Sequence, residues 1–140
     1  MDHIQGYLTT TYTLEGGSQT IGLRIGVESA QAQAWMAAGG VSRLAFISAE
    51  NPRSEVLTKQ ENAERMQQMA ERLRESNLRF WPAAGVPDST DWEVERAFFV
   101  ECDLAAALRL AAEFEQNAIV MVESGLCPAL VICRNLVTSG

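Results

Sequence analysis

Two segments near the N-terminus have the composition and spacing of β-strands. Residues Tyr7–Leu14 are rich in Thr and Tyr, which favour extended backbone. In Gln19–Ile25, apolar residues alternate with polar or small ones, the pattern of a strand with one buried face. Gly16 and Gly17 lie between these segments and supply a turn. The pattern therefore predicts an N-terminal β-hairpin.

Three later segments begin with a capping residue, Ser29, Thr58 or Asp103, and continue with apolar residues at helical spacing. Thr58 and Glu61 also match the S/T-x-x-E capping box. We predict helices that end near Ala38, Ser76 and Glu115. For the third helix, the spacing predicts an inward-facing stripe of Leu104, Ala107, Leu108 and Ala111.

Short apolar runs separate these helices. Arg43–Ala49 has the continuous apolar character of a central strand. Further strands are predicted at Leu78–Ala84, Arg96–Cys102, Ala118–Val122 and Ala129–Cys133, with a turn-rich loop at Gly85–Asp91. The element order, ββαβαββαββ, predicts a single α/β (α+β) domain over residues 1–140. We expect a mixed β-sheet that includes the N-terminal hairpin and packs against about three helices.

The charge and composition of the chain narrow its partners and its compartment. The net charge is −7, and no basic stripe is present, so we expect no nucleic acid partner and no binding to an anionic membrane surface. No apolar run is long enough to span a bilayer, and the N-terminus does not resemble a signal peptide. The 47% hydrophobic content is that of a globular protein, which we expect to be cytoplasmic.

The cysteines and the single histidine limit metal and nucleophilic chemistry. Three cysteines without a C-x-x-C pair predict reduced, buried thiols on strands rather than a metal site. One histidine leaves a serine or cysteine nucleophile without its usual base. We therefore expect no metal, and the sequence leaves any cofactor unknown.

Polar residues gather where the predicted Arg43–Ala49 strand ends and the next helix begins. Asn51, Pro52 and Ser54 form a loop at the end of that strand, which is either a ligand-binding loop or a simple turn. Asn62 falls on the apolar stripe of the helix, so its amide either holds this loop or faces a pocket. Arg65 could bind an anion, or it could pair on the helix surface with Glu61.

Two further positions carry candidate polar chemistry. Gln116 and Asn117 end the third helix, where Asn117 is typical of a helix C-terminus. Trp92 is flanked by Glu93 and Glu95, and a carboxyl group beside an apolar ring could have a raised pKa and act as an acid or base. The alternative is a solvated acidic loop.

Several of these motifs together resemble a bacterial family of uncharacterised proteins, domain of unknown function 3293. The segment FISAENPRSEVL with Asn62 and Arg65 is similar to its F-I-T-A-x-N-P-x-S and N-x-x-R elements. Tyr7 and Tyr12 resemble its N-terminal tyrosine pair, GVPDSTDWEVE its G-x-x-P and Trp–Glu region, and FEQNAIV its F-G-Q-N-A-I segment. Ser48 replaces the family's Thr and Glu115 its Gly. The resemblance implies no activity, but it groups the candidate residues in space.

Two functions follow from these observations. The first is a small-molecule site, for which Arg65 near a helix N-terminus favours an anionic ligand. Its candidate ligand-binding residues are Asn51, Ser54, Asn62, Arg65, Gln116 and Asn117, with Glu93 or Glu95 as acid or base. The alternative is a non-catalytic interaction or regulatory module, in which the polar motif is structural and the acidic region meets a basic partner.

Overall fold

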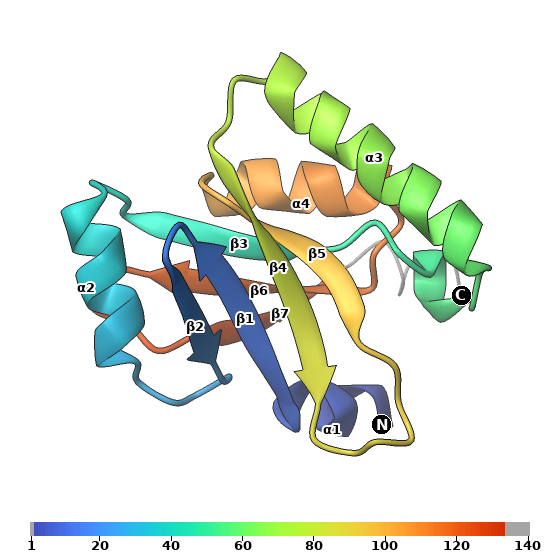
Figure 1. Cartoon of the computed structure of the whole chain (residues 1–140), viewed down its shortest axis with the longest axis horizontal. Coiled ribbons are helices and arrows are strands. Elements are labelled where there is room, and N and C mark those ends of the chain that lie inside the picture. Colours follow the sequence, from blue (N-terminus) through green and yellow to red (C-terminus); the bar gives the residue numbers. More distant parts are fainter. Residues whose placement is uncertain (1, 134–140) are drawn as a thin grey trace.

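Seven strands form one curled antiparallel sheet in the computed structural model, which describes residues 2–133 (Figure 1). The strands are β1 (Thr10–Gly16), β2 (Gln19–Leu23), β3 (Arg43–Ile47), β4 (Phe80–Pro87), β5 (Glu95–Val100), β6 (Ala118–Glu123) and β7 (Ala129–Ile132). Their order is β2-β1-β4-β5-β3-β6-β7. The α+β class and the N-terminal hairpin are confirmed. The predicted mixed sheet is wrong, because each helical connection joins strands that are not neighbours and all six neighbouring pairs are antiparallel.

The three predicted helices are present with their predicted caps. They are α2 (Ala30–Ala38), α3 (Lys59–Glu75) and α4 (Leu104–Glu113), and a 3₁₀ turn, η1 (Pro52–Ser54), precedes α3. Ser29 and Asp103 each accept a backbone hydrogen bond from the first turn of their helix, and Thr58 and Glu61 form both bonds of the capping box.

A short helix, α1 (Asp2–Leu8), was not predicted, because Tyr7 and Leu8 were assigned to the first strand. Thr9 and Thr10 divide the two elements. Their hydroxyl groups donate to the carbonyl oxygens of Gln5 and Gly6, and so end the helix locally before the strand begins.

The two faces of the sheet carry two separate hydrophobic cores. Along β3, Leu44 and Phe46 point to one face and Ala45 and Ile47 to the other, as the pleat requires. The first face packs against α2, and we call it the α2 face. The opposite face packs against α3 and α4, which lie side by side across it (Figure 1).

The inward stripe of α4 differs from the prediction. Leu104 and Leu108 are 45% and 36% exposed, whereas Leu110 is buried with Ala107 and Ala111. The large Leu110 side chain fills the space above the sheet, so the helix turns Leu104 and Leu108 toward solvent. Two other predictions were wrong in part. The predicted loop at Gly85–Asp91 begins later, because β4 continues through Gly85 to Pro87. Cys127 is exposed rather than buried, whereas Cys102 and Cys133 are buried free thiols as predicted.

The antiparallel order places many loop residues at one end of the sheet. The starts of β1, β5 and β6 lie at the same end as the ends of β3, β4 and β7. Helix α1 lies at this end, below the tip of β4 in the view of Figure 1. We call it the α1 end of the sheet, and it contains the residues singled out from the sequence.

Candidate functional site

The loop that follows β3 has an unusual backbone. Asn51, Arg53 and Ser54 have φ values of 46°, 52° and 65°, the left-handed region that non-glycine residues seldom occupy. Such a conformation costs on the order of 1–3 kcal/mol for each residue, and it persists only where the surroundings hold it. The contacts around this loop therefore hold it in its strained conformation.

Asn62 on α3 holds the loop through a pair of amide hydrogen bonds. Its Oδ1 accepts from the backbone N–H of Asn51 at 2.9 Å, and its Nδ2 donates to Asn51 Oδ1 at 2.9 Å. Asn51 Oδ1 also accepts from the backbone N–H of Leu57 at 3.0 Å. Asn62 is buried on the apolar stripe, as predicted, and its partner is the loop.

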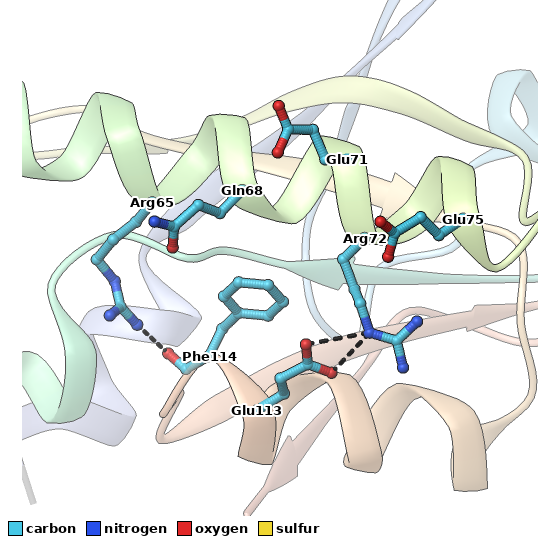
Figure 2. A pocket seen from close by; sticks show the side chains of 7 residues that line it. All are labelled: Arg65, Gln68, Glu71, Arg72, Glu75, Glu113 and Phe114. Atoms are coloured by element: carbon cyan, nitrogen blue, oxygen red, sulfur yellow. Dashed lines mark hydrogen bonds and ion pairs between the residues drawn. The ribbon is translucent and has the colours of Figure 1, made fainter.

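Arg65, one turn further along α3, bonds to two segments of the chain. Its Nε donates to Ala49 O at 2.5 Å, and its Nη2 donates to Phe114 O at 2.7 Å, the contact drawn in Figure 2. Its acidic neighbour is Glu115, whose Oε1 lies 3.6 Å from Nη1. The predicted pairing with Glu61 is wrong, because the Glu61 carboxylate is engaged in the capping box of α3.

The end of α4 meets the same loop. Gln116 is 7% exposed, and its Nε2 donates to Glu50 O at 3.0 Å and to Phe114 O at 3.1 Å. Asn117 donates from Nδ2 to Ser54 Oγ at 2.7 Å. Among the side chains that the structure describes, its Oδ1 is the one buried oxygen or nitrogen without a hydrogen-bond partner. The structure thus brings together all six residues predicted to form the site.

These contacts leave little capacity to bind an anion. The backbone N–H groups of Arg53, Ser54 and Glu55 all donate to carbonyl oxygens of the protein. The Arg53 side chain pairs with Glu115 Oε2 at 2.9 Å. Because the loop amides and the nearby guanidinium groups already have partners, the predicted anionic ligand gains no support here.

A second group of side chains, centred on Glu95, lies at the α1 end on the α2 face. Glu95 is half-buried at the start of β5, opposite Gly85 of β4. A Cβ built on Gly85 would lie 3.5 Å from Cζ of Phe46 and 3.9 Å from Cβ of Glu95. Burial first, and then the charge of Glu50, raise the pKa of Glu95 to about 7. No hydrogen bond or ion pair reaches its carboxyl group from the described residues.

Glu50 belongs to the network that ends the β3–β5 ladder. Its Oε1 accepts from the backbone N–H of Arg96 at 3.1 Å, and Ser48 Oγ donates to Arg96 O at 2.6 Å. Ser48 Oγ also accepts from the N–H of Glu50 at 2.9 Å. Burial raises the pKa of Glu50, although the Arg96 N–H and charge oppose this rise. The side chains of Glu50 and Ser48 therefore bond the backbone N–H and C=O groups of Arg96 at the end of the β3–β5 ladder.

The two tyrosines are in contact with each other and close to Glu95. Tyr12 Oη donates to Tyr7 O at 2.9 Å. Burial, and then the charges of Glu95 and Cys133, raise the pKa of Tyr7 to about 12. Burial and the charge of Glu95 also raise the pKa of Tyr12. The tyrosine pair was noted in the sequence, but its proximity to Glu95 depends on strand register.

The structure separates the two glutamates that were candidates for an acid or base. Glu93 and Trp92 are exposed, and Trp92 is 72% exposed. Glu95 is the half-buried one, and the aromatic residues beside Gly85, its partner on β4, are Phe46 and Tyr12 rather than Trp92. The raised pKa that the sequence suggested for a carboxyl group in this region is found at Glu95, and its cause is burial and Glu50 rather than Trp92. A role of either glutamate as an acid or base stays a prediction.

A shallow groove lies between α3 and α4 (Figure 2). It is lined by Arg65, Gln68, Glu71, Arg72, Glu75, Glu113 and Phe114. Figure 2 shows two contacts across it: Arg65 bonds Phe114 O, and Arg72 Nε lies 3.1 Å from both carboxylate oxygens of Glu113. Through these contacts, the charged side chains Arg65, Arg72 and Glu113 link α3 to the end of α4.

Comparison with known proteins assigns the chain to a family. Residues 47–119, just over half of the chain, match the family described as "Protein of unknown function (DUF3293)", and the chain belongs to this family. No curated protein and no solved structure matches the chain. In the part of the chain that the structure describes, no helix is long and apolar enough to cross a membrane, and no group of three described His, Cys, Asp or Glu side chains could hold a metal ion.

Proposed function

We propose that the protein binds a small polar molecule at the α1 end of the sheet, beside the Asn51–Ser54 loop, through Glu95 and Glu50. The observation that carries this proposal is the Glu95 carboxyl group, half-buried beside a second carboxyl group and unbonded within the described chain. Keeping such a group has a cost in folding free energy. Carboxyl groups with strongly raised pKa values in partly enclosed positions are typical of functional sites.

The chemistry of this end favours a ligand that donates hydrogen bonds, such as an amine. Above pH 7 the Glu95 carboxylate would accept bonds from an ammonium group, and the negative charge of Glu50 would add to the attraction. A carboxyl group with a pKa of about 7 can also take up and release a proton at neutral pH, which a reaction at this site would use.

The residues predicted from the sequence have a supporting role in this proposal. Asn62, Arg65 and Gln116 each bond the segment from Ala49 to Asn51, which carries Glu50 between its two ends. They fix the backbone that presents the Glu50 side chain to Arg96 and toward Glu95. Their direct contact with a ligand stays a prediction.

A thermal-shift screen at pH 8 tests the proposal. We expect amines to stabilise the protein more than nucleotides, sugar phosphates or carboxylates do. A ligand at 100 times its Kd should add about 2.7 kcal/mol to the free energy of unfolding. Gly85→Ala fills the space beside Glu95 at ordinary van der Waals distance, so it should weaken the response without unfolding the protein.

Two glutamine variants provide the matched comparison for this screen. Glu95→Gln should abolish the response, and Glu93→Gln, which alters an exposed carboxylate two residues away, should preserve it. The proposal fails if no amine stabilises the protein, or if Glu95→Gln responds as the unmodified protein does.

A second candidate function, an interaction module, is supported by the β4–β5 loop. Trp92 and Val94 are 72% and 53% exposed among the acidic residues Asp88, Asp91 and Glu93. An exposed aromatic ring between carboxylates suits a basic peptide, through cation–π contact and charge attraction. We expect an arginine-rich peptide to protect the fluorescence of Trp92 from quenching by acrylamide in 150 mM salt. The control is Trp92→Phe, in which the remaining fluorescence comes from Trp35 and Trp81. Equal quenching with and without the peptide would exclude this function.

A further inference from the structure

Helix α1 lies next to the group on which the proposed function depends. Tyr12 pairs with Gly85 of β4, and Gly85 pairs with Glu95 of β5, so Tyr12 and Glu95 lie in one row on the α2 face with a glycine between them. The half-buried Tyr7 lies next to this row, because its carbonyl oxygen accepts the hydroxyl of Tyr12, and the charge of Glu95 contributes to the raised pKa of Tyr7. Tyr12, whose hydroxyl bonds the Tyr7 carbonyl, also senses the charge of Glu95. Figure 1 shows α1 across the end of the sheet where β4 finishes. The helix therefore covers the Glu95 end of the sheet.

The same helix is only weakly attached to the rest of the fold. No described side chain of α1 belongs to either hydrophobic core. Its apolar residues Ile4 and Leu8 are 48% and 41% exposed. A helix of seven residues is not stable alone in water, so α1 depends on the few contacts that hold it.

Among the side chains that the structure describes, the hydrogen bonds to α1 reach its C-terminal half. Tyr12 Oη donates to Tyr7 O at 2.9 Å, Thr10 Oγ1 donates to Gly6 O at 2.7 Å, and Arg24 Nη2 reaches Leu8 O at 3.5 Å. Thr10 follows the helix closely in sequence and is the first residue of β1, so its bond is local. The bond from Tyr12 is therefore the main short link between α1 and the buried part of the sheet.

We infer that α1 is a lid over Glu95 that opens by local unfolding up to Thr9 and is held closed by the Tyr12–Tyr7 hydrogen bond. Its role in ligand access rests on the proposed function. Segments with few buried contacts open at lower free energy than the cores do, so the lid can open while the sheet stays intact. Opening removes Tyr7 from its place beside Glu95 and exposes the carboxyl group.

Carboxyl labelling with a carbodiimide and glycine ethyl ester, followed by peptide mass spectrometry, tests this lid without any ligand. In the unmodified protein, Glu95 should react more slowly than the exposed Glu93. Tyr12→Phe removes the hydroxyl and keeps the buried ring, so it should speed the labelling of Glu95 by roughly two- to tenfold, the effect of losing one hydrogen bond. Labelling of Glu101, at the opposite end of β5, should stay unchanged.

Thr13→Val is the matched control variant. It removes a hydroxyl bond to Ala84 O from the neighbouring position of β1, on the opposite face of the sheet, and should leave Glu95 labelling unchanged. Hydrogen exchange at Thr9, whose N–H bonds Gln5 O, should rise together with Glu95 labelling in Tyr12→Phe.

Two results would overturn the lid. The first is that Glu95 reacts as fast as Glu93 in the unmodified protein, because α1 would then not cover it. The second is that Tyr12→Phe speeds exchange at Thr9 while Glu95 labelling stays constant, because opening would then not expose Glu95. Since no ligand is present in the assay, these outcomes are independent of the ligand screen.

Discussion

At pH 8, replacement of Glu95 by glutamine is expected to raise the free energy of unfolding by up to about 3 kcal/mol. The folded chain raises the pKa of this carboxyl group from 4.5 to about 7, mainly through burial. Each pKa unit corresponds to about 1.4 kcal/mol. Between pH 4.5 and 7 the folded protein holds a proton that the unfolded chain has lost, so stability decreases as pH rises through this window. Glutamine has a similar shape but does not ionise. The Glu95→Gln variant should therefore not lose stability as pH rises through this window.

Urea denaturation at pH 5 and at pH 8 measures this difference. At pH 5, where most of the Glu95 population in the folded protein is protonated, the variant and the unmodified protein should be much closer in stability. Glu101→Gln is the control, because the Arg79 ion pair lowers the pKa of Glu101 and the substitution removes a favourable contact at both pH values. An equal effect of Glu95→Gln at pH 5 and pH 8 would show that Glu95 is not the titrating group.

Substitution of Arg65 by alanine is expected to destabilise the fold by about 3–4 kcal/mol. Hydrogen bonds from charged groups contribute about 1.5–3 kcal/mol each, and Arg65 makes two, to Ala49 O and Phe114 O. Losing them leaves the Ala49 carbonyl oxygen without its donor, leaves the Phe114 carbonyl oxygen with only its bond from Gln116, and releases the strained Asn51–Ser54 loop. Arg65→Lys should recover less than half of the loss, because an ammonium group cannot reach both carbonyls with the fixed geometry of a guanidinium group.

Arg72→Ala provides the comparison on the same helix. Arg72 lies seven residues further along α3 and pairs with Glu113 at the exposed side of the groove in Figure 2, with 43% of its side chain exposed. Exposed ion pairs contribute about 0–1 kcal/mol, so this variant should remain close to the unmodified protein in urea denaturation. If both variants lose the same free energy of unfolding, the Arg65 contacts contribute no more than an exposed ion pair does, and Arg65 does not hold the loop.

Several features of this fold could be predicted because they depend on residues close in sequence. The capping box at Thr58 and Glu61 is satisfied within one helical turn. The position of Asn62 on the buried stripe of α3 follows from helical spacing alone. A buried amide group requires a hydrogen-bond partner, so the sequence also predicted that the Asn62 side chain would be hydrogen-bonded. The grouping of the six polar residues came from the family resemblance, and the structure brings them together.

Other features could not be predicted because they depend on which segments meet. Arg65 has Glu61 within helical reach, yet it bonds Ala49 and Phe114, because Glu61 is used by the helix cap and the end of α4 lies beside α3. The helix α1 was missed because its end depends on hydroxyl groups of Thr9 and Thr10, residues that by type favour a strand.

The sequence by itself determined the seven strands, the three helices α2, α3 and α4, the α+β class and the polar loop after β3, because periodicity, caps and turn residues act over a few positions. The tertiary structure alone decided the antiparallel strand order, and with it the meeting of Glu95, Glu50, Tyr7 and Tyr12 at one end of the sheet. A pKa depends on burial and on neighbouring charges, and both are set by residues distant in the chain. Glu95 therefore became distinct from Glu93 only once β5 was paired with β4 and β3.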